Sequence, residues 1–175
     1  IAGVEVCMRG VPSGHGYYAN GDGELHYTYC ASLRLSHPST DPSSWTDSLG
    51  LQPDLIEMVG EPRLRGKHRK QYGIAKCSFF VHELQTPAES CEFEKFLAIV
   101  ADGLADKADF INSLVAEGGD AELFIGYFLE RTGTGFFLSS ELQQRIGALQ
   151  LALNLHIYNY DPTGESTSVP IKPNS

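Results

Sequence analysis

Five basic side chains crowd into one short stretch of an otherwise acidic chain. The stretch RLRGKHRK spans residues 63–70 and holds five of the 13 Lys and Arg residues, namely Arg63, Arg65, Lys67, Arg69 and Lys70. Guanidinium groups bind carboxylates and phosphates through paired hydrogen bonds, and ammonium groups attract the same anions. The pattern therefore predicts a site for an anion or an acidic partner. The alternative is a solvated loop whose charge balances the acidic surface.

Arg34 and His156 form a second pair of candidates. Arg34 shares the polar face of one predicted strand with Ser32, and His156 shares the polar face of another with Asn154. If the two strands are neighbours, this polar sheet face could bind a small ligand through both side chains. The alternative is a half-buried sheet face whose polar groups satisfy one another.

Motifs for catalysis or metal binding are missing. His82 and Glu83 open the sequence HELQT, which lacks the second histidine of H-E-x-x-H. The segment RTGTG lacks the lysine of a phosphate-binding loop, and no G-x-S-x-G elbow occurs. None of the four cysteines forms a C-x-x-C pair. No catalytic residue, metal ligand or cofactor is therefore predicted.

The cysteines also bear on the compartment. Cys30 and Cys77 lie in runs of alternating apolar residues, which is typical of small buried side chains in a reducing environment. No apolar run approaches the roughly 18 residues that span a bilayer. The opening residues, which do not start with Met, lack the apolar core of a signal peptide. We therefore expect a cytoplasmic protein.

The overall charge restricts the partners. The chain has 175 residues, enough for one domain with a real core, and a net charge of −9 from 22 acidic and 13 basic residues. Such a charge argues against binding nucleic acid or an anionic membrane, both of which attract clustered cations. It favours a basic protein as partner, because complementary charge steers association.

The first half of the chain predicts strands and one capped helix. Residues 27–35 alternate apolar and polar side chains, which indicates a strand with one buried face. Asp41 and Pro42 begin a helix that ends at Gly50 and buries Trp45 and Leu49. A short strand at 54–59, a polar loop at 61–73 and a strand at 74–84 follow. Residues 91–117 have an apolar helical stripe, which Gly103 should bend or divide.

The second half predicts further strands around one helix. Residues 120–130 are typical of a strand, RTGTG (131–135) of a hairpin turn, and 136–138 of the returning strand. Ser140 and Gln143 should form a capping box at the start of a helix over 140–150. Residues 151–160 alternate again. We expect an irregular N-terminal extension (1–24), a single domain (25–160) and a C-terminal tail (161–175).

This order of elements favours an α+β fold. Helices separated by strand pairs predict an antiparallel or mixed β-sheet with helices packed on one face. A ferredoxin-like β-α-β-β-α-β unit with an added β-α-β is one form of this arrangement.

Two motifs carry a resemblance to a known family. They are D-P-x-x-W-T-x-x-L-G-L-x-P over Asp41–Pro53 and G-x-G-F-F-L-S-x-E-L over Gly133–Leu142. With these motifs, roughly residues 29–160 resemble an uncharacterised bacterial family, domain of unknown function 4279. A tryptophan expected near Cys77 is missing. The resemblance implies no activity and no catalytic residues.

Three functions fit these observations. The first is a non-catalytic protein-binding module, with neutralisation of a basic toxin as one form. The second is a small-molecule sensor or an enzyme that uses Arg34 and His156 on the polar sheet face. The third is a structural module that dimerises through an exposed sheet edge.

Overall fold

The computed structural model describes residues 27–65, 70–85, 92–129 and 136–159. The expected N-terminal extension, the RTGTG turn and the C-terminal tail lie outside these described residues, and so do Lys67 and Arg69.

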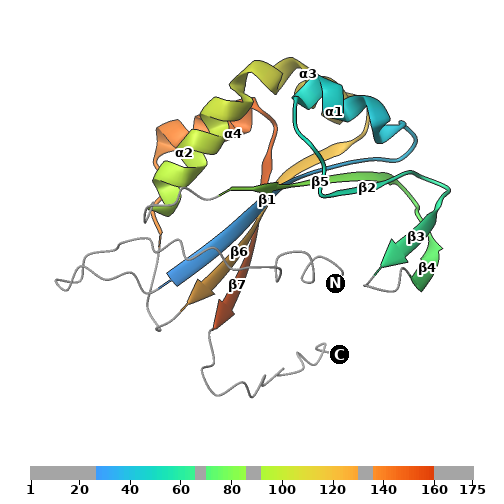
Figure 1. Ribbon diagram of the computed structural model, residues 1–175. Coiled ribbons are helices and arrows are strands. Elements are labelled where there is room, and N and C mark those ends of the chain that lie inside the picture. Colours follow the sequence, from blue (N-terminus) through green and yellow to red (C-terminus); the bar gives the residue numbers. More distant parts are fainter. Residues whose placement is uncertain (1–26, 66–69, 86–91, 130–135, 160–175) are drawn as a thin grey trace, which may run out of the picture.

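Five strands form one sheet in the order β2-β5-β1-β6-β7. They are β1 (Tyr27–His37), β2 (Leu55–Glu57), β5 (Ser78–Leu84), β6 (Asp120–Leu129) and β7 (Ala152–Asn159). The pairs β2–β5, β5–β1 and β1–β6 are antiparallel, whereas β7 runs parallel to β6. The helices lie on one face of this sheet (Figure 1). The α+β class with a mixed sheet covered on one face is therefore confirmed.

Helices connect the strands in three places. A 3-10 turn (Pro42–Ser44) and α1 (Trp45–Leu49) follow β1, and α2 (Phe93–Leu104) and α3 (Ala108–Ala116) follow β5. The 3-10 turn Ala105–Lys107 separates α2 from α3, so the predicted division near Gly103 is confirmed. Helix α4 (Ser140–Ala148) joins β6 to the parallel strand β7. None of the described helices is long and apolar enough to cross a membrane.

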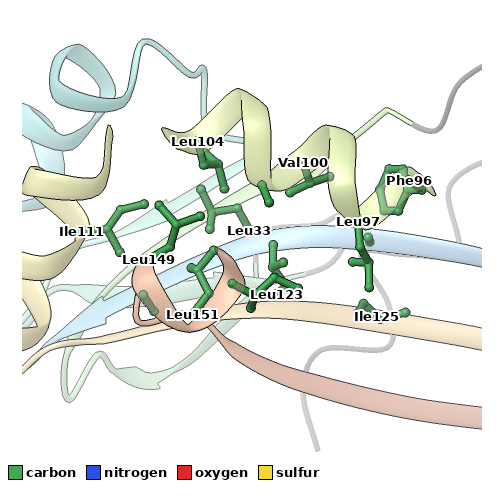
Figure 2. Packing of buried hydrophobic residues seen from close by; sticks show 14 of the residues in the cluster. Leu33, Phe96, Leu97, Val100, Leu104, Ile111, Leu123, Ile125, Leu149 and Leu151 are labelled. Carbon is green, nitrogen blue, oxygen red and sulfur yellow. The ribbon is translucent and has the colours of Figure 1, made fainter. Parts of the chain in front are cut away.

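Strand β1 lies at the centre of the sheet and supplies the middle of the core. It pairs with β6 from Tyr27 to Ser36 and with β5 from Ala31 to His37. Its alternate side chains toward the helices are all buried: Tyr27, Tyr29, Ala31, Leu33 and Leu35. The apolar stripe of α2 packs onto these residues and onto Leu123 and Ile125 of β6 (Figure 2).

The first helical turn forms as the sequence predicts. The Asp41 carboxylate accepts hydrogen bonds from the hydroxyl and the backbone N–H of Ser43, which lower the pKa of Asp41. Gly50 ends α1 in the left-handed conformation, with φ of 66°. Trp45 and Leu49 are each only 1% exposed. This segment therefore anchors α1 to the core.

A buried histidine links β1 to α3. Nδ1 of His37 accepts hydrogen bonds from the backbone N–H groups of Ser39 (3.2 Å) and Thr40 (2.9 Å). The ring proton must therefore be on Nε2, which donates to the carbonyl oxygen of Glu117 at 3.2 Å. These hydrogen bonds of the ring fix the turn that leads from β1 to α1. The sequence pattern gave no signal for them.

The expected polar loop at 61–73 is wrong. A two-stranded sheet is formed there by β3 (Pro62–Arg65) and β4 (Lys70–Ile74), and β5 begins only at Ser78. Because these strands pair only with each other, they need no apolar face, and their sequence shows no period of two. The hairpin projects from the end of the sheet (Figure 1).

Two expectations around α4 are also wrong. Residues 136–138 form no strand, and Phe136 instead packs against Phe93 and Tyr127 with ring centroids 5.1 and 5.6 Å apart. The helix is capped by Ser139, whose hydroxyl accepts from the N–H of Leu142. A capping box starting at Ser140 does not form, because the helix begins one residue earlier than the box requires.

The prediction of buried cysteines in a reducing environment fails, because Cys30 and Cys77 are both only half-buried and Cys30 is not a free thiol. This residue is disulfide-bonded, and Cys77, the other described cysteine, is free. The partner of Cys30 therefore lies outside the described residues. Cys30 is on the helix-free face of the sheet opposite Gly126, where a Cβ atom would lie 2.9 Å from its sulfur. Since disulfides are rare in the cytosol, the cysteines no longer support the cytoplasmic expectation.

We expect Trp45→Ala to lower the free energy of unfolding by about 3–5 kcal/mol, because it empties a large buried site. Ser48→Ala on the exposed side of α1 is the matched control and should change stability by less than about 0.5 kcal/mol. Urea unfolding followed by circular dichroism measures both. Equal stability of the two variants would contradict the role of Trp45 as an anchor.

We expect Cys30→Ser to lower stability by about 2–5 kcal/mol, the usual cost of removing a native disulfide. A reductant should destabilise the wild type to a similar extent and leave Cys30→Ser unchanged. The control Cys77→Ser should respond to the reductant as the wild type does. Thermal unfolding with and without reductant measures this, and four reactive thiols in the untreated protein would refute the disulfide.

Candidate functional site

The pairing of three strands assembles a polar and aromatic group on the helix-free face of the sheet. The antiparallel register places Arg34 of β1 opposite Glu122 of β6. The parallel register of β6 and β7 places Phe124 beside Asn154. We call the group the Arg34 cluster, and it consists of Arg34, Glu122, Phe124, Asn154, His156 and Tyr158.

Arg34 is held from three directions. Its guanidinium carbon lies 3.5 Å from the centre of the Phe124 ring. Its Nε donates to the hydroxyl of Ser32 at 3.1 Å, and Nη1 lies 3.7 Å from Oε1 of Glu122. The side chain is only 11% exposed. Burial lowers the pKa of Arg34 and the Glu122 carboxylate opposes that shift, so the guanidinium remains a charged group with a fixed partner.

Strand β7 contributes the other side of the cluster. The His156 ring lies 4.7 Å from that of Phe124, so Arg34 and His156 converge on the same aromatic side chain. The amide of Asn154 donates to Oε2 of Glu122 at 3.0 Å. Tyr158 stacks on Phe128 with ring centroids 5.0 Å apart. The structure thus brings together the two residues that the sequence singled out.

Arg34, Glu122 and Asn154 already have charged or hydrogen-bonding partners within the cluster, which is typical of a structural network and not of a reactive site. Glu122, the carboxylate beside Arg34, is engaged by both Arg34 and Asn154. Phe124, which both candidate residues contact, is 3% exposed. No group of three or more potential metal ligands occurs among the residues that the structure describes. An anion would have to compete with Glu122 for the guanidinium.

The basic residues of the stretch 63–70 are distributed over the two strands of the hairpin, with Arg63 and Arg65 in β3 and Lys70 in β4. Arg63 in β3 donates from Nε to Oε2 of Glu57 in β2 at 2.9 Å, and the Glu57 side chain is only 9% exposed. Arg65 and Lys70 are paired residues of β3 and β4. Arg63 therefore ties the hairpin to the sheet through an internal carboxylate. Anion binding by the basic stretch stays a prediction.

His82 and Glu83 also have structural contacts. Nδ1 of His82 donates to the carbonyl oxygen of Gln52 at 2.7 Å, and the backbone N–H of Glu83 donates to Oδ2 of Asp54 at 2.7 Å. These bonds hold the segment after α1 against β5.

Other described Lys and Arg side chains also lie close to a carboxylate. Besides Arg34 and Arg63, Arg145 pairs with Asp102, Lys107 with Asp106 and Lys95 with Glu92. Lys76 alone among the described Lys and Arg side chains has no carboxylate partner. Exposed carboxylates without a described basic partner include Asp109, Glu117 and Asp120, at α3 and the start of β6. We call these three residues the α3 acidic surface.

Sequence reasoning missed Glu122, Phe124 and Tyr158 and named Asn154 only as a residue on the same strand face as His156. Glu122, Phe124, Asn154 and Tyr158 lie at alternate positions of β6 and β7, so the period of two did place them on one face. Only the strand order, with β6 between β1 and β7, brings them to Arg34.

We expect Glu122→Gln to lower stability by about 1 kcal/mol, because Arg34 loses a largely desolvated charge partner. Asp102→Asn is the control, since its carboxylate is 74% exposed in the pair with Arg145 and should contribute much less. Denaturant unfolding compares the two. If both substitutions have the same effect, the Arg34 pair is no stronger than a surface pair.

Comparison with known proteins identifies a family for this chain but gives no activity. Residues 26–160 match a family described as a domain of unknown function, DUF4279. No curated protein and no solved structure matches the chain. The match covers most of the chain and includes every described strand and helix. The chain therefore belongs to the DUF4279 family.

Proposed function

We propose that the protein is a non-catalytic binding module for a basic protein partner. One observation carries the proposal: five Lys and Arg side chains that the structure describes (Arg34, Arg63, Lys95, Lys107 and Arg145) are each matched by a carboxylate, whereas many described carboxylates have no cation. With a net charge of −9, the chain presents a negative field to its surroundings. Such a field accelerates encounter with a basic surface and disfavours acidic ligands.

The α3 acidic surface is the contact region that we propose for this partner. Asp109, Glu117 and Asp120 are exposed, and none has a basic partner among the described residues. Glu117 bonds only to a neutral donor, the hydroxyl of Ser113, at 3.0 Å. These carboxylates can therefore accept Lys or Arg of a partner without breaking an internal ion pair.

The surface is also held in a fixed place. His37 binds the carbonyl of Glu117 and thereby fixes the end of α3 against β1. Asp120 begins β6 and is paired with Ser36 of β1. A rigid surface loses little entropy on binding, which favours a recognition role.

A small-molecule site at the Arg34 cluster is a second candidate function. The convergence of Arg34 and His156 on Phe124 favours it. Such a ligand would stack beside His156 and Tyr158, and an anionic one would displace Glu122 from Arg34. That competition makes this function the weaker proposal.

Neutralisation of a basic toxin is the most specific form of the first proposal. It predicts that the gene of this chain, or of its family members, lies beside a gene for a basic secreted protein. If no family member has such a neighbouring gene, the proposal of toxin neutralisation is wrong, whereas the proposal of a binding module is not affected.

Native mass spectrometry of the full chain, purified from the cells that produce it, tests the proposal. We expect one basic protein at a fixed ratio, retained at about 50 mM salt and largely released at about 500 mM, because salt screens contacts between exposed charges. A bound small molecule would support the second candidate, and a chain without any partner would refute the first.

Matched variants locate the contact. Glu117→Gln with Asp120→Asn should reduce the bound fraction about tenfold at low salt. Glu61→Gln with Glu141→Gln removes the same charge from exposed positions elsewhere and should reduce it much less. Equal losses would show that net charge alone matters and that the α3 acidic surface is not the contact.

A further inference from the structure

The helix-free face of the sheet carries a disulfide. The side chain of Cys30 lies on this face, because the residues on either side of it in β1 face the helices. Cys30 is disulfide-bonded, and the other described cysteine, Cys77, is free. The partner of Cys30 is therefore one of the two remaining cysteines of the chain, Cys7 or Cys91.

The position of α2 argues against Cys91. This cysteine comes two residues before Phe93, the first residue of α2, whose ring contacts that of Tyr29 on the helix-covered face at 5.4 Å. Two residues span at most about 7 Å. A disulfide requires Cα atoms within about 7 Å and Cβ atoms that point toward each other, whereas Cys30 points to the opposite face. A bond to Cys91 would require the chain to change faces within these two residues.

The place of Cys7 in the chain sets no such restriction. Residues 8–26 connect it to Tyr27, the first residue of β1. A segment of this length spans up to about 60 Å when it is extended. Cys7 can therefore approach Cys30 from the helix-free face.

The surroundings of Cys30 suit a second segment of chain on this face. Gly126 lies opposite Cys30 in β6, and a Cβ atom there would lie 2.9 Å from the sulfur of Cys30. Glycine inside a strand often marks the close approach of another backbone. Phe128, the next residue of the same row, stacks on Tyr158 with ring centroids 5.0 Å apart. Both rings are half-buried, and no helix covers this face.

We propose that Cys30 is bonded to Cys7 and that the chain around Cys7 packs on the helix-free face beside Phe128 and Tyr158. The side chains that flank Cys7 in sequence are mostly apolar and include Val4, Val6 and Met8. Apolar side chains gain free energy by packing on aromatic rings that no helix covers. The docked segment borders the Arg34 cluster, because Cys30 and Arg34 belong to the same row of β1. This inference rests on neither function proposed above.

Peptide mapping without reduction, after free thiols have been blocked, tests the pairing. Trypsin cleaves after Lys and Arg, so Cys7 is in peptide 1–9, Cys30 in peptide 10–34, and Cys77 and Cys91 together in peptide 77–95. We expect peptide 1–9 joined to peptide 10–34, and both thiols of peptide 77–95 blocked. Peptide 10–34 joined to peptide 77–95, or joined to no other peptide, would overturn the inference.

Limited proteolysis of the folded full chain tests the packing. Arg9 is two residues from Cys7, so the docked segment should protect it from trypsin. We expect cleavage after Arg9 to be at least about tenfold faster in Cys7→Ser than in the wild type, because cleavage follows the population of the open state. Circular dichroism verifies that each variant is folded.

Cys91→Ser is the matched control, because it removes a thiol of the same kind without breaking the proposed bond. It should be cleaved after Arg9 at the wild-type rate and should retain the link between peptides 1–9 and 10–34. Equal rates in the wild type and Cys7→Ser would overturn the packing of the segment on the sheet. Equal acceleration by both substitutions would also overturn it, since the effect would then not depend on the bond to Cys7.

Discussion

The position of β1 between β5 and β6 is the constraint on which the rest of this structure depends. Both edges of β1 are hydrogen-bonded, and its side chains alternate between a fully buried apolar row and a polar row. Because all helices pack on the apolar row, the other face has no helix to cover it (Figure 1). Several polar groups on that face have partners within the sheet itself, and the Arg34 cluster contains them.

The pairing of charges within the molecule also underlies the function that we propose. The three arginines whose side chains the structure describes each lie close to a carboxylate: Arg34 to Glu122, Arg63 to Glu57 and Arg145 to Asp102. These internal pairs neutralise three arginines, whereas exposed carboxylates such as Asp109, Glu117 and Asp120 have no basic partner among the described residues. Recognition by such a surface depends on long-range attraction and exposed carboxylates, not on a buried reactive group.

The sequence predicted those parts of the fold that have a regular apolar period or a distinct cap. The alternation in 27–35 and in 151–160 corresponds to β1 and β7, and the segment between Asp41-Pro42 and Gly50 forms the 3-10 turn Pro42–Ser44 followed by α1. The β3–β4 hairpin was missed because strands outside the main sheet bury no regular row. The disulfide of Cys30 and the contact of Arg34 with Phe124 were missed because each depends on residues far apart in sequence, and strand order cannot be obtained from periodicity.

Residue-resolved hydrogen exchange of the full chain tests the central role of β1 most directly. If β1 holds both halves of the sheet, its amides from Ala31 to Ser36, which lie between two strands, should exchange most slowly of all and only through global unfolding. The amides of the short edge strand β2 should exchange much faster through local opening. Exchange in β1 as fast as in β2 would contradict the account, because the centre of the sheet would then open independently of the rest.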